Sequence, residues 1–258
     1  MSERIDDFGN GFWHIRGEYR AGGLVNLGTH CALVRLADGN FVFLDSYTLP
    51  DPILREVEAL TDGGAKIRAI VNVHPFHTLH CEWMYSAFPQ ATLYGTARHK
   101  RKFPDLPWHE VLCEDDALAD EFDGELDFKV PDGVNLVCDD PNVHFGSVLA
   151  YHRASRTIFV DDTLSLLNAP FPLSLLPMTG RLDFHPGLAK ALQDDPQAVP
   201  QFREWVMRLG TEWHDARRVA MAHNSVLDLP TADFPERLGE ALGRAEPVLA
   251  KHQARIGG

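Results

Sequence analysis

Three of the thirteen histidines, His74, His77 and His80, fall within seven consecutive residues. Neutral imidazole is the commonest metal ligand among side chains, and it can also move protons near neutral pH. The apolar run from Ile67 to Val73 precedes these histidines, and a helix-like run from Glu82 to Phe88 follows them. They therefore occupy a turn between a strand and a helix, where open α/β sheets bind ligands. The alternative is that they are ordinary loop histidines whose hydrogen bonds are satisfied locally.

Three more candidate ligands occur where an apolar run meets polar sequence. His144 precedes the predicted strand 148–151, Asp162 follows the strand 157–160, and His223 follows the strand 218–221. Imidazole nitrogens combined with a carboxylate suit zinc, iron or manganese. Three such ligands with one open position would lower the pKa of water from 15.7 to about 7. The predicted metal ligands are His74, His77, His144, Asp162 and His223, and the predicted catalytic residues are Asp162 and His77.

Short strands and amphipathic helices must position these residues. We predict strands at 12–15, 25–27, 31–36, 41–44, 67–73, 92–94, 126–130, 134–138, 148–151, 157–160 and 218–221. We predict helices at 53–60, 82–88 and 198–209, a basic helix after residue 96, and a helical tail at 234–256. Asp38-Gly39 indicates a tight hairpin turn. The proline-rich segment 166–186 cannot be a regular helix or a central strand, and we expect it to shape the mouth of a substrate site.

The composition bounds the class of protein. The chain has 258 residues and no internal repeat or low-complexity linker, so we predict one domain over residues 1–258 with a C-terminal helical tail. The formal net charge of −13 argues against nucleic acid and anionic membranes as partners, since both require basic patches. We interpret the basic cluster 98–102 as a solvated helix face rather than a phosphate track. A small-molecule substrate is the expected partner, and a homodimer is left open.

The cysteines and the N-terminus indicate a cytoplasmic protein. The four cysteines are far apart and form no CxxC pair, which is typical of reduced thiols. Residues 1–10 are polar and acidic, unlike a signal peptide. Cys81 follows His80 directly, so a ligand or catalytic role stays open, but a buried structural thiol is the favoured interpretation.

The order of these elements and of their polar ends resembles the metallo-β-lactamase superfamily over roughly residues 12–225. The family's His-x-His-x-Asp-His motif aligns with Asn72-Val73-His74-Pro75-Phe76-His77. Phe43-Leu44-Asp45-Ser46 resembles its early strand and turn, and His144-Phe145-Gly146-Ser147 resembles its second metal motif, one residue shorter. Ile158 to Leu164 resembles its Gly-Asp-Thr-Leu segment and offers Asp162 as the bridging carboxylate. Ala222-His223-Asn224 resembles its terminal Gly-His.

The resemblance implies an α/β (α+β) fold, the four-layer αββα sandwich of glyoxalase II-like hydrolases. It also implies two metal sites, and two departures argue against both being present. Asn72 replaces the first histidine of the motif, and Phe76 replaces its aspartate, which also helps to orient the attacking water. A single metal ion remains feasible, because three protein ligands suffice for catalytic zinc. His80 is an alternative ligand. The stretch 74–94 further resembles an uncharacterised branch of the superfamily, a DUF4336-like group.

Three functions compete at this point. The favoured one is a metal-dependent hydrolase of metallo-β-lactamase type with a degenerate, mononuclear site, with zinc ahead of iron or manganese. Asp162 would ligate or bridge the metal, and a histidine such as His77 would shuttle protons. The second is a non-catalytic binding or interaction protein on the same fold, without bound metal. The third is a redox or oxygen-linked iron protein.

Overall fold

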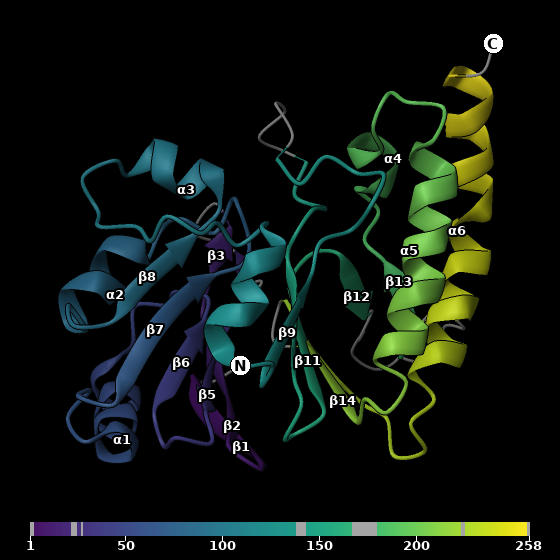
Figure 1. Ribbon diagram of the computed structural model, residues 1–258. Helices are drawn as coiled ribbons and strands as arrows, with labels where there is room; N and C mark the ends of the chain where they lie inside the picture. Colours follow the sequence, from purple (N-terminus) through teal and green to yellow (C-terminus); the bar gives the residue numbers. More distant parts are fainter. Residues whose placement is uncertain are drawn as a thin grey trace. The chain divides into compact units, whose positions relative to one another are not determined.

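The computed structural model describes residues 3–21, 25–26, 28–137, 143–166, 180–222 and 225–256. The chain divides into two compact units, each with helices around a main sheet (Figure 1). The first unit consists of Met1–Phe128, His152–Ser155 and Ala222–Asn224. The second consists of Lys129–Tyr151, Arg156–Met221 and Ser225–Gly258. The single domain over 1–258 stays a prediction.

The first sheet has six strands. Their order is β1 (Arg4–Gly9), β2 (Phe12–Gly17), β5 (Thr29–Arg35), β6 (Phe41–Leu44), β7 (Ile67–Asn72) and β8 (Thr92–Gly95). The first four run antiparallel, and the predicted Asp-Gly hairpin joins β5 to β6. The strands β6, β7 and β8 run parallel. A separate short pair consists of β3 (Arg20–Ala21) and β4 (Val25–Asn26).

The first unit contains the helices α1 (Asp51–Thr61), α2 (Cys81–Ala87) and α3 (Ala97–Lys102) and the 3₁₀ helix η1 (Asp116–Phe122). The helix α1 buries Ile53 and Val57, and α2 buries Met84, in one core with Phe43 and Ile70 of the sheet. This burial follows from the amphipathic pattern that predicted both helices.

The parallel strands bring three polar segments to one edge of the first sheet. In the register, Leu44 lies opposite Val71 and Asn72 lies opposite Gly95. The residues that follow β6, β7 and β8 therefore leave the sheet side by side. This edge, at the carboxyl ends of parallel strands, is where open sheets bind ligands.

The second sheet has five strands. Their order is β15 (Ser225–Asp228), β14 (Arg218–Met221), β11 (Thr157–Val160), β10 (Leu149–His152) and β9 (Leu126–Lys129). The strands β11 and β14 are parallel, and β14 and β15 are antiparallel. A further antiparallel pair consists of β12 (Leu164–Leu166) and β13 (Leu182–Phe184).

Helices cover the second sheet as well. They are α4 (Leu188–Ala191), α5 (Ala198–Glu212) and α6 (Phe234–Ile256), and α5 and α6 lie side by side (Figure 1). Phe202 and Trp205 of α5 and Leu238 of α6 share a core with the sheet. Arg203 also pairs with both carboxylate oxygens of Glu246, at 2.9 and 2.7 Å. The predicted C-terminal helix is confirmed with the expected bounds, and it packs into its unit rather than forming a detached tail.

One prediction of secondary structure is wrong. Residues 134–137 of the predicted strand 134–138 form no strand, and Val134 makes only an isolated bridge to Leu192. The reason is local, because the Asn135 amide donates to the Ala191 carbonyl and so serves α4 rather than a sheet. In the proline-rich segment, residues 182–184 form one strand of a two-stranded pair, which agrees with the prediction that the segment has no central strand, and 167–179 lie outside the described residues.

None of the helices in the described part of the chain combines the length and the apolar character needed to cross a membrane.

Candidate metal centre

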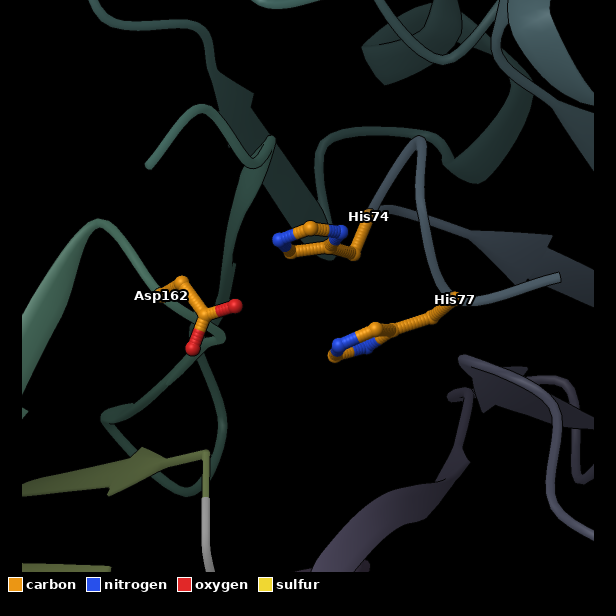
Figure 2. A group of neighbouring side chains, drawn as sticks. All are labelled: His74, His77 and Asp162. Atoms are coloured by element: carbon orange, nitrogen blue, oxygen red, sulfur yellow. The ribbon is translucent and has the colours of Figure 1, made fainter. Parts of the chain in front are cut away.

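His74 and His77 form a stacked pair directly after β7. The His77 amide donates to the His74 carbonyl at 3.0 Å, which closes a tight turn and brings the two rings together. The ring centroids are 4.0 Å apart and the planes differ by 16° (Figure 2). His74 is fully buried, whereas the His77 side chain is 33% exposed. Two imidazoles are thus held in one orientation, with one of them accessible to solvent.

Asp45, at the end of β6, supports this pair from behind. Its Oδ1 accepts the Val73 amide at 2.8 Å and the His74 amide at 3.4 Å, and its Oδ2 lies 3.5 Å from Nδ1 of His77. The residue is buried and adopts a left-handed backbone conformation (φ 62°). A carboxylate at Nδ1 favours the tautomer with the proton on Nδ1, which leaves Nε2 as a ligand. Sequence reasoning missed this role, although it singled out the turn that contains Asp45.

Asn72 is committed to the fold. Its Oδ1 accepts from the Ser46 hydroxyl at 2.6 Å and from the Cys81 thiol at 3.4 Å. Its Nδ2 donates to the Tyr94 carbonyl at 3.0 Å. The amide therefore links β7 to the segment that follows β6, to α2 and to β8, and its hydrogen bonds leave it no ligand role.

Cys81 is a buried structural thiol, as favoured from the sequence. It is fully buried at the start of α2, and burial raises the pKa of its thiol to about 12. A thiol that stays protonated at neutral pH is a poor nucleophile and a poor metal ligand.

Phe76 occupies the aspartate position of the motif and carries a cation on its ring. The guanidinium carbon of Arg98 lies 4.3 Å from the ring centroid, which is a close cation–π contact. A phenyl ring cannot ligate a metal. With Asn72 and Phe76 in place of a histidine and an aspartate, this turn lacks the ligands for a second metal ion.

His80 lies at the N-cap position of α2, immediately before the helix. Its Nδ1 is 2.8 Å from the Thr48 hydroxyl, and its ring packs edge-on against Tyr47 with centroids 5.2 Å apart. Burial, followed by the neighbouring His77, lowers the pKa of His80. These contacts assign His80 to packing at the helix start, and they do not support it as a replacement ligand.

His144 and Asp162 lie in the second unit, on two segments that a threonine ties together. Asp162, the third side chain labelled in Figure 2, is 7% exposed and follows β11. The Thr163 hydroxyl accepts the Ser147 amide at 3.1 Å and donates to the Phe145 carbonyl at 3.0 Å. The loop after half-buried His144 is thereby fixed to the residue after Asp162. Sequence reasoning missed Thr163, although both motifs that it joins were identified.

His223 lies outside the described residues, as does most of the proline-rich segment predicted to shape the substrate mouth. Among the described candidates, His74, His77 and Asp162 offer imidazole nitrogens and a carboxylate oxygen. These are donor types of catalytic zinc sites. The donor chemistry, and the carboxylate that orients His77, fit one divalent metal ion.

No protein-family model matches the chain, and no curated protein matches it. The DUF4336-like resemblance therefore stays a prediction.

Solved structures, in contrast, match along nearly the whole chain. The metallo-β-lactamase DIM-1 is 13% identical with a TM-score of 0.59, over 93% of this chain and 98% of that one. VMB-1 is 11% identical with a TM-score of 0.60, over 94% and 98%. The metallo-β-lactamase FIM-1 from Pseudomonas aeruginosa, in its mono-zinc form, is 11% identical with a TM-score of 0.59, over 95% and 96%. This chain therefore has the metallo-β-lactamase fold, of the α/β (α+β) class that the sequence predicts.

Proposed function

We propose that the protein is a metal-dependent hydrolase with a single divalent metal ion. His74, His77 and Asp162 are the proposed ligands, and His144 and His223 are the candidates for completing the set. The similarity to metallo-β-lactamases supports the fold, and the donor types support the metal. The observation that carries the proposal is the stacked His74–His77 pair with the Asp45 carboxylate 3.5 Å from His77.

The roles of the residues follow from their contacts. The Asp45 carboxylate, whose Oδ2 lies 3.5 Å from Nδ1 of His77, would favour the tautomer with the proton on Nδ1 and leave Nε2 as the metal ligand. The bound ion would supply Lewis-acid polarisation of a carbonyl or phosphoryl oxygen. Asp162, as a carboxylate, would ligate or bridge the metal. The partly exposed His77 would either ligate the ion through Nε2 or, when it is not a ligand, carry a proton to solvent, because one ring cannot do both.

Zinc is the proposed metal, with iron and manganese as alternatives. Histidine and carboxylate ligands suit all three ions. The structural neighbour FIM-1 is described in a mono-zinc form, which makes one zinc ion per chain the first case to test. A small-molecule substrate and a cytoplasmic location complete the proposal, and the net charge of −13 supports a partner other than nucleic acid.

Metal analysis of the full chain, purified without a histidine tag, tests the proposal. After reconstitution with zinc we expect about one ion per chain by atomic emission spectroscopy. His74→Ala and Asp162→Asn should each lower zinc affinity by at least about a hundredfold, since each removes a proposed ligand. His214→Ala, which removes an exposed histidine, is the matched control and should bind zinc normally. A stoichiometry far below one in the unaltered chain would contradict the proposal.

The second candidate is a non-catalytic binding protein on this fold. The contacts of Asn72 favour it, because a residue at a ligand position has become part of the hydrogen-bonded framework. In that case a chelator should leave the melting temperature unchanged, since only a bound ion stabilises the native state by mass action. Zinc binding with no turnover of ester, thioester, lactam or phosphodiester substrates would likewise support this candidate.

A further inference from the structure

Arg98 and Lys102 lie one helical turn apart on α3 and both contact the turn that carries His74 and His77. Residues four apart share a helix face. The Arg98 guanidinium covers the Phe76 ring at 4.3 Å, and the Lys102 ammonium donates to the Thr78 hydroxyl. The basic helix is therefore a solvated face only in part, because two of its cations are directed to the histidine turn.

Neither cation is neutralised by an acid in the described part of the chain. Nε of Arg98 is buried without a hydrogen-bond partner among those residues, and Lys102 forms no ion pair with them. Several arginines elsewhere face carboxylates closely, for example Arg203 at 2.7 Å from Glu246. Other cations, such as Arg55, also form no ion pair among the described residues, so what distinguishes Arg98 and Lys102 is their contact with the histidine turn.

Glu114, an acid that contacts the start of α3, has its own hydrogen-bond donor. Glu114 accepts the Ala97 amide at 2.9 Å, so its carboxylate serves the backbone at the start of the helix. Burial raises the pKa of Glu114. Among the described residues, half-buried Glu114 forms no ion pair with Arg98 or Lys102.

We propose that Arg98 and Lys102 bind an oxyanion of the substrate, a carboxylate or a phosphate, beside the histidine pair. This inference rests on the proposed hydrolase and names its substrate class as an anionic one. Phe76 removes a metal ligand, and the guanidinium on its ring supplies positive charge at the same turn. Arginine presents a planar fork that matches two oxygens of a carboxylate or phosphate, and lysine adds a point charge.

Anion titration of the full chain tests this site. Inorganic phosphate and acetate are the probes, followed by isothermal titration calorimetry and by the NMR signals of the arginine Nε–H groups. We expect saturable binding of at least one probe in a background of chloride, and a shift of the Arg98 Nε–H signal. The stronger of the two probes identifies the substrate group as phosphate or carboxylate. Equal, non-saturable responses to phosphate, acetate and chloride would overturn the inference.

Substitutions assign the binding to these two residues. Arg98→Met should weaken binding of the stronger probe by about tenfold to a hundredfold, as expected for a lost charged hydrogen bond. Arg98→Lys should recover part of this loss, and Lys102→Met should weaken binding by about threefold to tenfold. Arg101→Met is the matched control, since it removes an exposed cation from the same helix and should change affinity less than twofold. Unchanged binding in Arg98→Met overturns the inference.

Two further measurements separate folding and metal from anion binding. If Arg98→Met fails to fold, judged by circular dichroism, then Arg98→Lys and Lys102→Met decide the outcome, because both retain the aliphatic stem that packs on the turn. The titrations are made with zinc-free and zinc-loaded chain. Loss of zinc binding with retained Arg98-dependent anion binding removes the hydrolase and keeps the anion site. Normal zinc binding with no effect of Arg98 removes only the anion site.

Discussion

The buried side-chain amide of Asn72 shows how one residue can change the number of metal ions that this turn can bind. Asn72 has a side-chain acceptor bound by Ser46 and Cys81 and a side-chain donor bound to Tyr94. Both ends of the amide are needed, because Ser46 and Cys81 donate hydrogen bonds to its oxygen and the Tyr94 carbonyl accepts one from its nitrogen. The residue therefore acts as a bridge between three neighbouring segments rather than as a weakened ligand.

Asn72→Asp should destabilise the protein although it changes the volume very little. The new carboxylate would place an acceptor against the Tyr94 carbonyl and bury a charge, so we expect a loss of about 2–4 kcal/mol in the free energy of unfolding. Urea denaturation followed by circular dichroism measures it. Asn135→Asp, at an exposed asparagine, should change the stability by less than about 0.5 kcal/mol. Equal effects of the two substitutions would contradict the bridging role of Asn72.

Because His152 is buried, we expect the free energy of unfolding to fall at acidic pH. Burial lowers the pKa of this histidine from 6.5 to about 4, although Arg35 opposes the shift through a backbone hydrogen bond. As the pH falls, the unfolded chain takes up the proton before the folded protein does. The contribution of His152 to the free energy of unfolding is therefore complete above pH 6.5 and is lost as the pH falls toward 4. Between pH 7 and pH 5 the loss should be about 2 kcal/mol.

His152→Gln removes the titrating group and should flatten this part of the pH profile. The measurement is urea unfolding at half-unit pH steps from 7 to 5, with His214→Gln as the exposed-histidine control. The control should keep the slope of the unaltered protein. Part of the slope should survive in His152→Gln, because burial also lowers the pKa of His99 to about 3. A slope equal to that of the unaltered protein would show that His152 does not contribute.

Spacing identified His74 and His77, because both lie at a strand-to-helix turn that a single sequence can reveal. It could not identify the partners that the pairing of distant segments supplies. Asp45 reaches His77 because β6 and β7 run parallel, and this register depends on the whole sheet. The same limit applies to Arg98, whose basic neighbours suggested a solvated face until α3 was placed against Phe76.

At the level of elements, Gly133 explains why a predicted strand is absent. The turn Pro131-Asp132-Gly133 lies against the start of α5, and Gly133 has a φ of 72°. A Cβ atom there would lie 2.0 Å from the Ala198 carbonyl oxygen. The close approach directs residues 134–137 toward α4, where the Asn135 amide finds its acceptor.

Gly133→Ala should therefore cost far more than backbone strain alone. Gly180 has a similar φ of 75°, but a Cβ there meets nothing within 4 Å, so Gly180→Ala measures the strain by itself. We expect about 1 kcal/mol for Gly180→Ala and at least 2–3 kcal/mol more for Gly133→Ala. Thermal and urea unfolding compare the two variants. Equal losses would show that α5 can move away from the turn at little cost.

The elements that the sequence predicted best have strong local patterns. Strands 41–44, 157–160 and 218–221 are apolar runs between turn residues, and helix 234–256 has a clear amphipathic period. The strands β1 and β15 were missed because edge strands are stabilised by pairing with a neighbour, and their own sequences are polar. Local propensity cannot supply the partner strand, so these elements depend on tertiary pairing.

For the whole molecule, the metal proposal predicts how substitutions of the proposed ligands combine. If one ion binds His74, His77 and Asp162, each of these residues is needed for the metal-dependent gain in stability. Two separate and weaker sites would instead respond to substitutions independently, because distant sites have additive effects.

Zinc removal separates these cases. At a free zinc concentration of 100 times Kd, binding should add about 2.7 kcal/mol to the stability of the unaltered protein, and chelation should reverse it. His74→Ala and Asp162→Asn should each abolish this zinc-dependent gain, measured by calorimetry with and without chelator. With one shared ion the double variant loses no more of the gain than either single variant, since the ion is already absent. If each single variant loses only part of the gain and the losses add in the double variant, the ligands belong to separate sites and the single-metal hydrolase is wrong.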